Sequence, residues 1–159
     1  MKIRILAIGK IKEKYLQAAI AEYAKRLKPY LKLEILEGPE LNAPEGLSPG
    51  EIERILAKEG QFLAAKMREG DYNIVLDLDG ELLTSPQIAQ VVADEGMMRG
   101  KTLNFIIGGS LGVAQSVKDK CHLRLCFGKA TFPHQLIRVF LVEQIYRSLK
   151  IIKNEPYHK

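Results

Sequence analysis

The sequence has few cysteines and no long hydrophobic run. Cys121 and Cys126 are the only cysteines among its 159 residues. A disulfide between them is possible, but a reduced cytoplasmic protein with two buried free thiols is the favoured interpretation. A structural zinc site needs four ligands, and no further Cys or His group completes a set with these thiols and His122. No stretch approaches the roughly 20 apolar residues of a membrane span, and the N-terminus becomes charged too soon for a signal peptide.

Three common functional motifs are also missing. No Lys-Ser or Lys-Thr pair follows the paired glycines at 108–109, which excludes a Walker phosphate loop. These glycines do not fit the dinucleotide-binding fingerprint, because Lys129 stands where an acidic residue would be expected. No Gly-x-Ser-x-Gly elbow for a nucleophilic serine is present. Repeats and interdomain linkers are absent too, and we expect one domain spanning 1–159.

The sequence does contain alternating strand and helix patterns. Apolar runs bounded by turn residues predict strands over 3–8, 31–36, 72–78, 102–107 and 123–127. Apolar stripes with helical spacing predict helices over 13–27, 48–67, 85–98, 113–119 and 135–152. This alternation predicts an α/β fold with a mostly parallel sheet flanked by helices.

The most informative stretch joins the fourth predicted strand to the next helix. The largely apolar residues 103–107 lead directly into Gly108-Gly109. In open α/β sheets ligands bind at the carboxyl ends of strands, and glycine lets a ligand approach the main chain closely. Glycine pairs also serve tight turns that bind nothing. The residues of this stretch alone leave a ligand site and a plain turn equally open.

Few titratable residues follow the other strands. Asp77 and Asp79 lie on the same side of a strand end, where they could bind a metal or act as acid and base. Acidic residues at such positions more commonly form turns, and we expect Asp79-Gly80 to end the third strand. His134 stands at a helix start and is interpreted as a capping or packing residue rather than a base.

The helix over 135–152 is apolar around nearly its whole circumference. A helix of this kind is buried on all sides, and one face can pack on the protein's own sheet. We expect a second copy of the chain to cover the other face, giving a homodimer with a self-complementary interface. The alternative is a helix enclosed within one large monomer core, which is hard to arrange in 159 residues.

The C-terminal quarter is strongly basic. Residues 116–159 carry nine Lys or Arg against three Asp or Glu. Such a surface attracts the phosphate backbone of nucleic acids, although basic side chains also serve simply to solvate a helix face. The chain ends on Tyr157, His158 and Lys159, three consecutive hydrogen-bond donors. A chain terminus is ordinarily without function, so this concentration of polar groups is unusual.

Several segments together resemble a known family. They run from end to end of the chain and comprise 5–10, 21–26, 58–60, 105–109, 131–134, 138–139, 143–147 and 156–159. The most specific are Thr131-Phe132-Pro133-His134 and Pro156-Tyr157-His158-Lys159, at the appropriate distances from Ile106-Ile107-Gly108-Gly109. On these motifs the chain resembles the ribosomal large subunit pseudouridine methyltransferase H family, within the knotted SPOUT class of RNA methyltransferases.

The resemblance implies an enzyme that transfers a methyl group from S-adenosylmethionine to N3 of a pseudouridine in 23S ribosomal RNA. It also implies a C-terminal trefoil knot, a homodimer with the cofactor near the interface, no metal, and a substrate that is an assembled ribosome rather than free RNA. By position, the cofactor-binding residues would be Leu76, Gly108, Phe127, Gly128, Lys129, Ala130, Thr131 and Phe132.

We hypothesise that Tyr157, His158 and Lys159 close over the target nucleotide, with the partner subunit of a dimer as one source of this tail. In this hypothesis His158 accepts the N3 proton, and Lys159 holds a phosphate or the base anion. Two other classes remain open at this point. A non-enzymatic RNA- or ribosome-binding factor would use the same basic surface, and a flavodoxin-like oxidoreductase would share the order of strands and helices.

Overall fold

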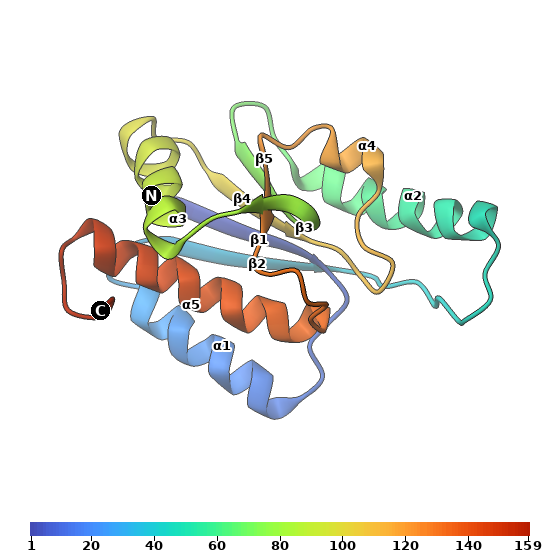
Figure 1. Cartoon of the computed structure of the whole chain (residues 1–159), viewed down its shortest axis with the longest axis horizontal. Coiled ribbons are helices and arrows are strands. Elements are labelled where there is room, and N and C mark those ends of the chain that lie inside the picture. The colour runs from blue at the N-terminus through green and yellow to red at the C-terminus, as the bar shows by residue number, and fades with distance from the viewer.

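Five parallel strands lie side by side at the centre of the structure, a computed structural model that describes all 159 residues (Figure 1). The strands are β1 (Lys2–Ile8), β2 (Lys32–Gly38), β3 (Tyr72–Leu82), β4 (Leu103–Ile107) and β5 (Leu123–Cys126). Their order across the sheet is β2-β1-β4-β3-β5, and every neighbouring pair is parallel. The predicted α/β class with a parallel sheet is therefore confirmed.

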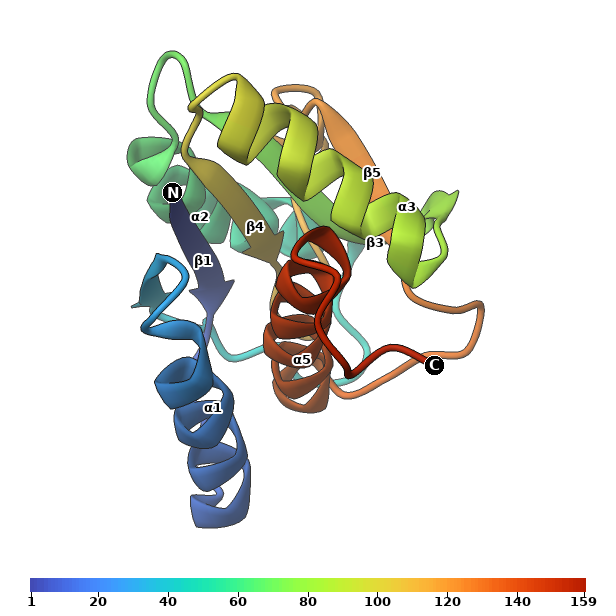
Figure 2. The ribbon, with the colours of Figure 1, turned by 90° about the vertical axis from the view of Figure 1, so that its left-hand side faces the viewer.

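Helices cover both faces of this sheet (Figure 2). One face carries α1 (Lys14–Leu27), α3 (Ser85–Val91) and α5 (His134–Ile152), and the other carries α2 (Pro49–Lys66) and α4 (Gln115–Lys118). Because side chains alternate along a strand, each strand contributes to two cores. In β1, for example, Ile3 and Ile5 pack toward α5, whereas Leu6 and Ile8 pack toward α2 and α4.

Two helices begin with the capping pattern that the sequence shows. The Ser48 hydroxyl accepts the Glu51 N–H while the Glu51 carboxylate accepts the Ser48 N–H, and α2 follows with Pro49 in its first turn. Thr84 and Gln87 form the same reciprocal pair at the start of α3. These bonds satisfy backbone N–H groups that have no partner within the helix. The predicted helix starts are confirmed within a residue.

The predicted end of the third strand at Asp79-Gly80 is wrong. Leu125 of β5 pairs first with Leu76 and again with Glu81, so the intervening residues loop out and β3 then resumes as far as Leu82. A Cβ on Gly80 would lie 2.7 Å from the carbonyl carbon and oxygen of Arg124. Glycine at this position therefore lets the backbones of β3 and β5 approach closely enough to pair again.

The predicted helix over 85–98 also differs from the structure. After α3 the chain continues as a π-helix, η1 (Val92–Met98), in which the Arg99 N–H reaches the Asp94 carbonyl at 3.0 Å. Within it Gly96 packs closely against Met1 and Leu103, where a Cβ would lie 2.6 Å from the Met1 sulfur. Glycine at position 96 thus lets η1 lie close to the amino ends of β1 and β4.

The two cysteines are free, and only one is fully buried. Cys126 is buried at the end of β5, whereas Cys121 is half-buried. The expectation of two buried thiols is therefore correct for Cys126 and wrong for Cys121. Even so, burial raises the pKa of the Cys121 thiol to about 11, which keeps it protonated and unreactive at neutral pH.

α5 is enclosed by α1, α3 and the sheet, but not on every side. Leu141, Val142, Ile145 and Leu149 are completely buried in the main core. Phe140, in contrast, keeps 39 % of its surface exposed. Burial all round is therefore incomplete within one chain. No helix, α5 included, has both the length and the apolar composition needed to cross a membrane.

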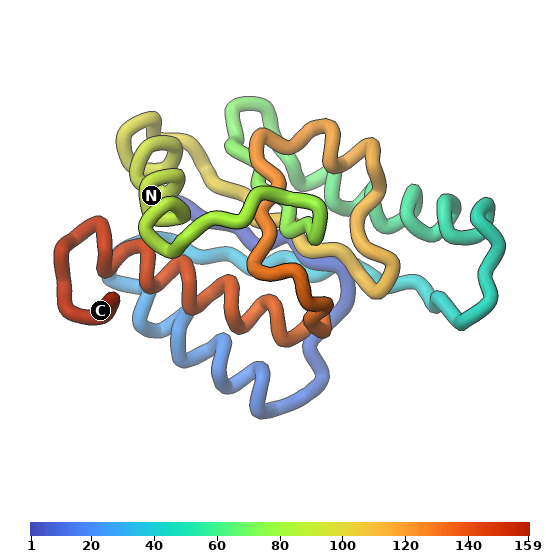
Figure 3. The backbone as a smooth tube through the Cα atoms, in the orientation of Figure 1, coloured from blue at the N-terminus to red at the C-terminus, as the bar shows by residue number.

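The segment after β5 crosses the last part of β3, where the chain leads into α3, before α5 begins (Figure 3). The two segments touch, because the Lys129 ammonium donates a hydrogen bond to the Leu78 carbonyl at 3.3 Å. This is the part of the chain in which the resemblance implies a trefoil knot, and the knot stays a prediction.

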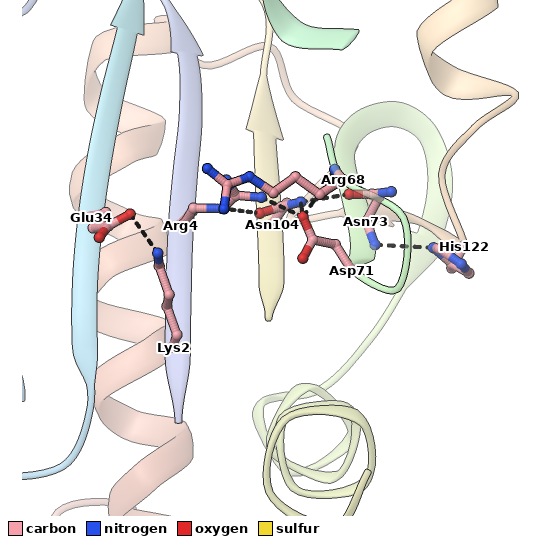
Figure 4. Close-up of polar contacts among 8 residues, drawn as sticks. All are labelled: Lys2, Arg4, Glu34, Arg68, Asp71, Asn73, Asn104 and His122. Atoms are coloured by element: carbon pink, nitrogen blue, oxygen red, sulfur yellow. Dashed lines mark hydrogen bonds and ion pairs between the residues drawn. The ribbon is translucent and has the colours of Figure 1, made fainter. Parts of the chain in front are cut away.

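A buried polar network joins three strands near their amino ends (Figure 4). The Arg4 guanidinium of β1 donates to Asn104 of β4 at 2.8 Å and pairs with the carboxylate of Asp71. Asn104 in turn donates to Asp71 at 2.9 Å and to Asn73 of β3 at 2.7 Å. Arg4 and Asn104 are almost inaccessible to solvent, so each of these bonds replaces water that the side chains cannot reach.

This network predicts a large cost for removing one charge. Asp71→Ala leaves the Arg4 cation buried without a counter-ion, and we expect it to lower the free energy of unfolding by about 3–5 kcal/mol in urea denaturation. Glu34→Ala is the matched control, because the Lys2–Glu34 pair is about a third exposed on each side and such pairs contribute only about 0–1 kcal/mol. Equally small losses of unfolding free energy in the two variants would contradict the assignment of Arg4 and Asp71 to a buried ion pair.

Candidate active site

An apolar cavity lies where β3, β4 and β5 approach the start of α5. It has a volume of about 140 Å³. Its walls come from the end of paired β3 at residues 76–78, the glycine turn after β4, the end of β5 at residues 125–128, and the first turn of α5. No lysine or arginine lines it. The position agrees with the general rule that ligands of parallel sheets bind at the carboxyl ends of the strands.

The cavity brings together most of the residues expected to bind a cofactor. Leu76, Gly108, Phe127, Gly128 and Phe132 all line it, although they come from three separate segments.

The other three expected residues, Lys129, Ala130 and Thr131, do not line the cavity. They form the exposed outer part of the same loop. The Lys129 ammonium instead ties this loop to the Leu78 carbonyl of the β3 segment.

The glycine turn folds back on itself. A Cβ on Gly108 would lie 2.2 Å from the carbonyl oxygen of Gly112, and Gly112 has a φ of +87° that favours glycine. The Gly112 N–H donates to the Gly109 carbonyl at 3.1 Å, closing the turn. The glycines that close this tight turn also present their main chain to the cavity. A tight turn and a backbone accessible to a ligand therefore occur together here.

Asp77 is the acidic residue of the cavity wall, and its charge is already paired. Its carboxylate lies 2.9 Å from the Lys118 ammonium of α4 and accepts the Asp79 N–H at 3.3 Å. Burial acts to raise the pKa of Asp77, but the Lys118 and Asp79 hydrogen bonds outweigh it and the pKa lies below its ordinary value. The expectation that these acids form a turn at the end of the third strand is wrong, because both lie within β3. No group of three or more His, Cys, Asp or Glu side chains is arranged to hold a metal ion.

Arg138 is an important polar residue that the sequence analysis did not single out. It is almost completely buried in α5, and its guanidinium donates to the carbonyls of Ile8 and Gly9 at 2.8 Å each and to Glu37 at 2.8 Å. Burial lowers the pKa of Arg138 and Glu37 opposes this effect, and an arginine remains charged in such a setting. Its signals in the sequence were a charge among the apolar residues of the last helix and a place in one of the segments that carry the family resemblance.

His134, interpreted from sequence as a cap or packing residue, lines the cavity from the first turn of α5. No side-chain hydrogen bond caps this helix. The His134 Nε2 is buried without a hydrogen-bond partner, and it lies 3.6 Å from the Glu40 carboxylate. His134 therefore lines the cavity and has a carboxylate close to its ring.

The C-terminal tail is attached to the other half of α5. The Tyr157 hydroxyl donates to Glu143 at 3.0 Å, the Arg147 guanidinium lies 4.7 Å from the centre of its ring, and Tyr146 packs against it edge-on. Burial raises the pKa of Tyr157, and the hydrogen bonds to Tyr23 and Glu143 raise it further, so the phenol stays protonated. This tyrosine is a firmly held part of the fold.

The last two residues are exposed. The His158 ring lies 3.3 Å from an Arg147 nitrogen, and Lys159 is at the surface. Neither they nor Tyr157 line the cavity. Arg147 is 13 residues beyond His134, or roughly 20 Å along the helix axis. Figure 1 shows the C-terminus beside the red end of α5, away from its orange start. The structure of one chain thus does not bring the tail and the cavity together.

Comparisons with known proteins agree on one family. A family model described as "Predicted SPOUT methyltransferase" matches residues 1–158. The chain is 48% identical over 159 residues to the "Ribosomal RNA large subunit methyltransferase H" of Carboxydothermus hydrogenoformans. Proteins of the same name from Clostridium beijerinckii and Enterococcus faecalis are 49% and 45% identical over 159 residues. In each of the three pairs the similarity covers all of both chains.

Two glycine-to-alanine substitutions, one in the glycine turn and one in α2, are expected to change the stability of the protein differently. Gly108→Ala forces a methyl group against the Gly112 carbonyl, and we expect such overpacking to destabilise the protein by about 1–3 kcal/mol. Gly50→Ala meets no atom within 4 Å in α2, and we expect it to be neutral or to stabilise by up to about 1 kcal/mol. Thermal unfolding compares the two, and a Gly108→Ala variant as stable as the wild type would contradict the geometry.

Proposed function

The chain belongs to the SPOUT methyltransferases, as a member of the ribosomal RNA large subunit methyltransferase H family, and from this we propose that it methylates N3 of a pseudouridine in 23S ribosomal RNA. The methyl donor in this proposal is S-adenosylmethionine. The observation that carries the proposal is the apolar cavity at the ends of β3, β4 and β5, in a chain that matches the family from end to end.

The cavity wall fits a donor of this kind. S-adenosylmethionine carries no phosphate, and the wall offers no lysine or arginine that would bind one. Leu76, Phe127 and Phe132 supply apolar surface for the adenine, and the backbone at Gly108 and Gly128 supplies hydrogen-bonding groups for the adenine and ribose. Lys129, Ala130 and Thr131 complete the same loop, and we propose that they hold it against the donor.

We propose that residues outside the cavity accept the proton that N3 loses. A bound donor supplies an electrophilic methyl group, and the attacking N3 must be held in line with it and lose its proton. We assign the nucleotide to Tyr157, His158 and Lys159, with His158 accepting the proton at a ring nitrogen. Lys159 then neutralises a phosphate or the base anion as negative charge develops. Tyr157 keeps its own proton and serves to anchor the tail.

We propose a homodimer in which the tail of one chain serves the cavity of its partner. Two observations support this arrangement. The tail is held on the half of α5 that is distant from the cavity, by Glu143 and Arg147. In addition, exposed apolar side chains remain beside the cavity, notably Phe132 and Phe140, whose rings pack edge-to-face at 5.7 Å. A second copy would cover these rings and bring its own tail close to the donor.

The RNA itself would be held by charge. The exposed basic residues of the C-terminal quarter would provide contacts to phosphates without reading sequence; they are Lys120, Lys129, Lys153 and Lys159. A chain of 159 residues has little surface for recognising one nucleotide in a long RNA. We therefore propose that the substrate is an assembled ribosome in the cytoplasm, whose shape supplies the remaining specificity.

Calorimetric titration with S-adenosylmethionine tests the donor assignment. We expect saturable binding with one donor site in the cavity, and we expect Phe132→Ala to weaken it because the ring forms part of the wall. Tyr15→Ala is a matched control on an exposed aromatic residue that lies outside the cavity. An absence of binding at millimolar donor would contradict the proposal and favour a non-enzymatic ribosome-binding factor.

Removal of the tail separates donor binding from methyl transfer. We expect deletion of residues 157–159 to leave donor affinity unchanged and to lower kcat by about 10²–10⁴-fold, the usual contribution of a general base. His158→Ala should reproduce most of this loss without disturbing the Tyr157 anchor. Near-normal kcat in the deletion variant would exclude a catalytic role for the tail.

Mixing two defective proteins tests which subunit supplies the tail. The tail-deleted protein is combined with Leu76→Ala, which carries an intact tail but a weakened cavity and keeps the exposed Phe132 and Phe140 rings. If the tail acts across the dimer, mixed dimers contain one complete site and activity returns. If each tail serves its own chain, every site stays defective and mixing restores nothing.

A further inference from the structure

A carboxylate from outside the cavity lies between two glycine turns. Glu40 follows β2, and its Oε1 accepts the Ser110 N–H of the glycine turn at 3.2 Å. A Cβ on Gly109 would lie 3.2 Å from the same oxygen, and a Cβ on Gly9 would lie 2.6 Å from Glu40 Oε2. The carboxylate therefore fills the space between the turn after β1 and the turn after β4, where Gly9 and Gly109 have no side chains of their own.

Glu40 also faces His134, a polar residue of the cavity wall. Its Oε2 lies 3.6 Å from His134 Nε2, a buried nitrogen with no hydrogen-bond partner. His134 lines the cavity, as do Gly108 and Gly109, whereas Glu40 does not. One side chain thus touches both the glycine turn and the first turn of α5 without contacting the space in which a ligand would lie.

A second acid, which is buried, supports the loop that carries Glu40. Glu59 of α2 is only 5% exposed, and its Oε1 accepts the Leu41 N–H at 3.0 Å. Its Oε2 is buried without a partner, 3.3 Å from the position of a Cβ on Gly109. Burial raises the pKa of Glu59, and the nearby charge of Glu40 raises it further. The Leu41 hydrogen bond opposes these two effects without cancelling them.

We infer that Glu40 is a positioning residue for the donor site, holding the glycine turn and His134 in place from behind the cavity wall. The inference rests on the proposed binding of S-adenosylmethionine in this cavity. Glycines lose more conformational freedom on folding than other residues, so a turn of three glycines needs an external tether. The Ser110 N–H bond to a carboxylate provides that tether, and bonds to charged groups are stronger than those between neutral groups.

The test compares two substitutions that differ in one hydrogen-bond acceptor. Glu40→Ala removes the acceptor for the Ser110 N–H, whereas Glu40→Gln keeps an amide oxygen of similar reach. We expect calorimetry to show a Kd for S-adenosylmethionine raised about tenfold or more in Glu40→Ala and less than about threefold in Glu40→Gln. Glu45→Ala, an exposed acid in the same loop, is the matched control and should not change the Kd.

Amide hydrogen exchange at Ser110 gives a second readout without any donor. We expect faster exchange in Glu40→Ala and near-normal exchange in Glu40→Gln. Glu40→Met, which has similar length and no acceptor, takes the place of the alanine variant if that variant does not fold. Wild-type Kd and wild-type exchange in a folded variant without the acceptor would overturn the inference, as would equal losses in the glutamine and alanine variants.

The two proposals fail in different ways. If the wild-type protein binds no S-adenosylmethionine, the proposed function is wrong, and Ser110 exchange still decides whether Glu40 holds the turn. If the wild type binds the donor but the acceptor-free variant behaves identically in both measurements, the proposed function stands and the role of Glu40 is wrong.

Discussion

The buried guanidinium of Arg138 is the interaction on which the active-site end of this protein depends. It bonds two carbonyls at the end of β1 and the carboxylate of Glu37 at the end of β2. Because these partners belong to the sheet, the bonds fix the first turns of α5 against the edge where ligands bind. His134 lies one helical turn earlier on the same face, so its place in the cavity wall follows from the same anchor. Removing Glu37 would leave the buried Arg138 charge without its counter-ion.

The two halves of α5 contact different parts of the structure, the cavity and the C-terminal tail. The first half of α5 forms part of the cavity wall, and the second half holds Tyr157 through Glu143, Arg147 and Tyr146. A cavity formed by backbone and apolar groups is suited to binding a donor. Its acid, Asp77, is neutralised by Lys118, and its imidazole, His134, lies beside the Glu40 carboxylate. In the proposed mechanism binding and proton transfer are divided between separate segments, which a dimer would bring together.

The sequence predicted those features that depend on local physical chemistry. The apolar run into Gly108-Gly109 and the capping pair at Ser48 and Glu51 each follow from neighbouring residues, and the structure has both. The continuation of β3 past Gly80 could not be predicted, because it depends on contact with Arg124, a residue distant in sequence. Glu40 escaped notice for the same reason, as its partners Ser110 and His134 come from other elements. Family resemblance, rather than periodicity, identified the separate loops that meet at the cavity.

The most direct measurement of the central claim is mass spectrometry of 23S ribosomal RNA from cells lacking this protein. The account predicts that one pseudouridine loses its N3-methyl group while other modifications are unchanged. Restoring the gene should restore that methyl group, and restoring it without the codons for Tyr157, His158 and Lys159 should not. An unaltered set of methylated nucleotides in cells without the protein would contradict the account.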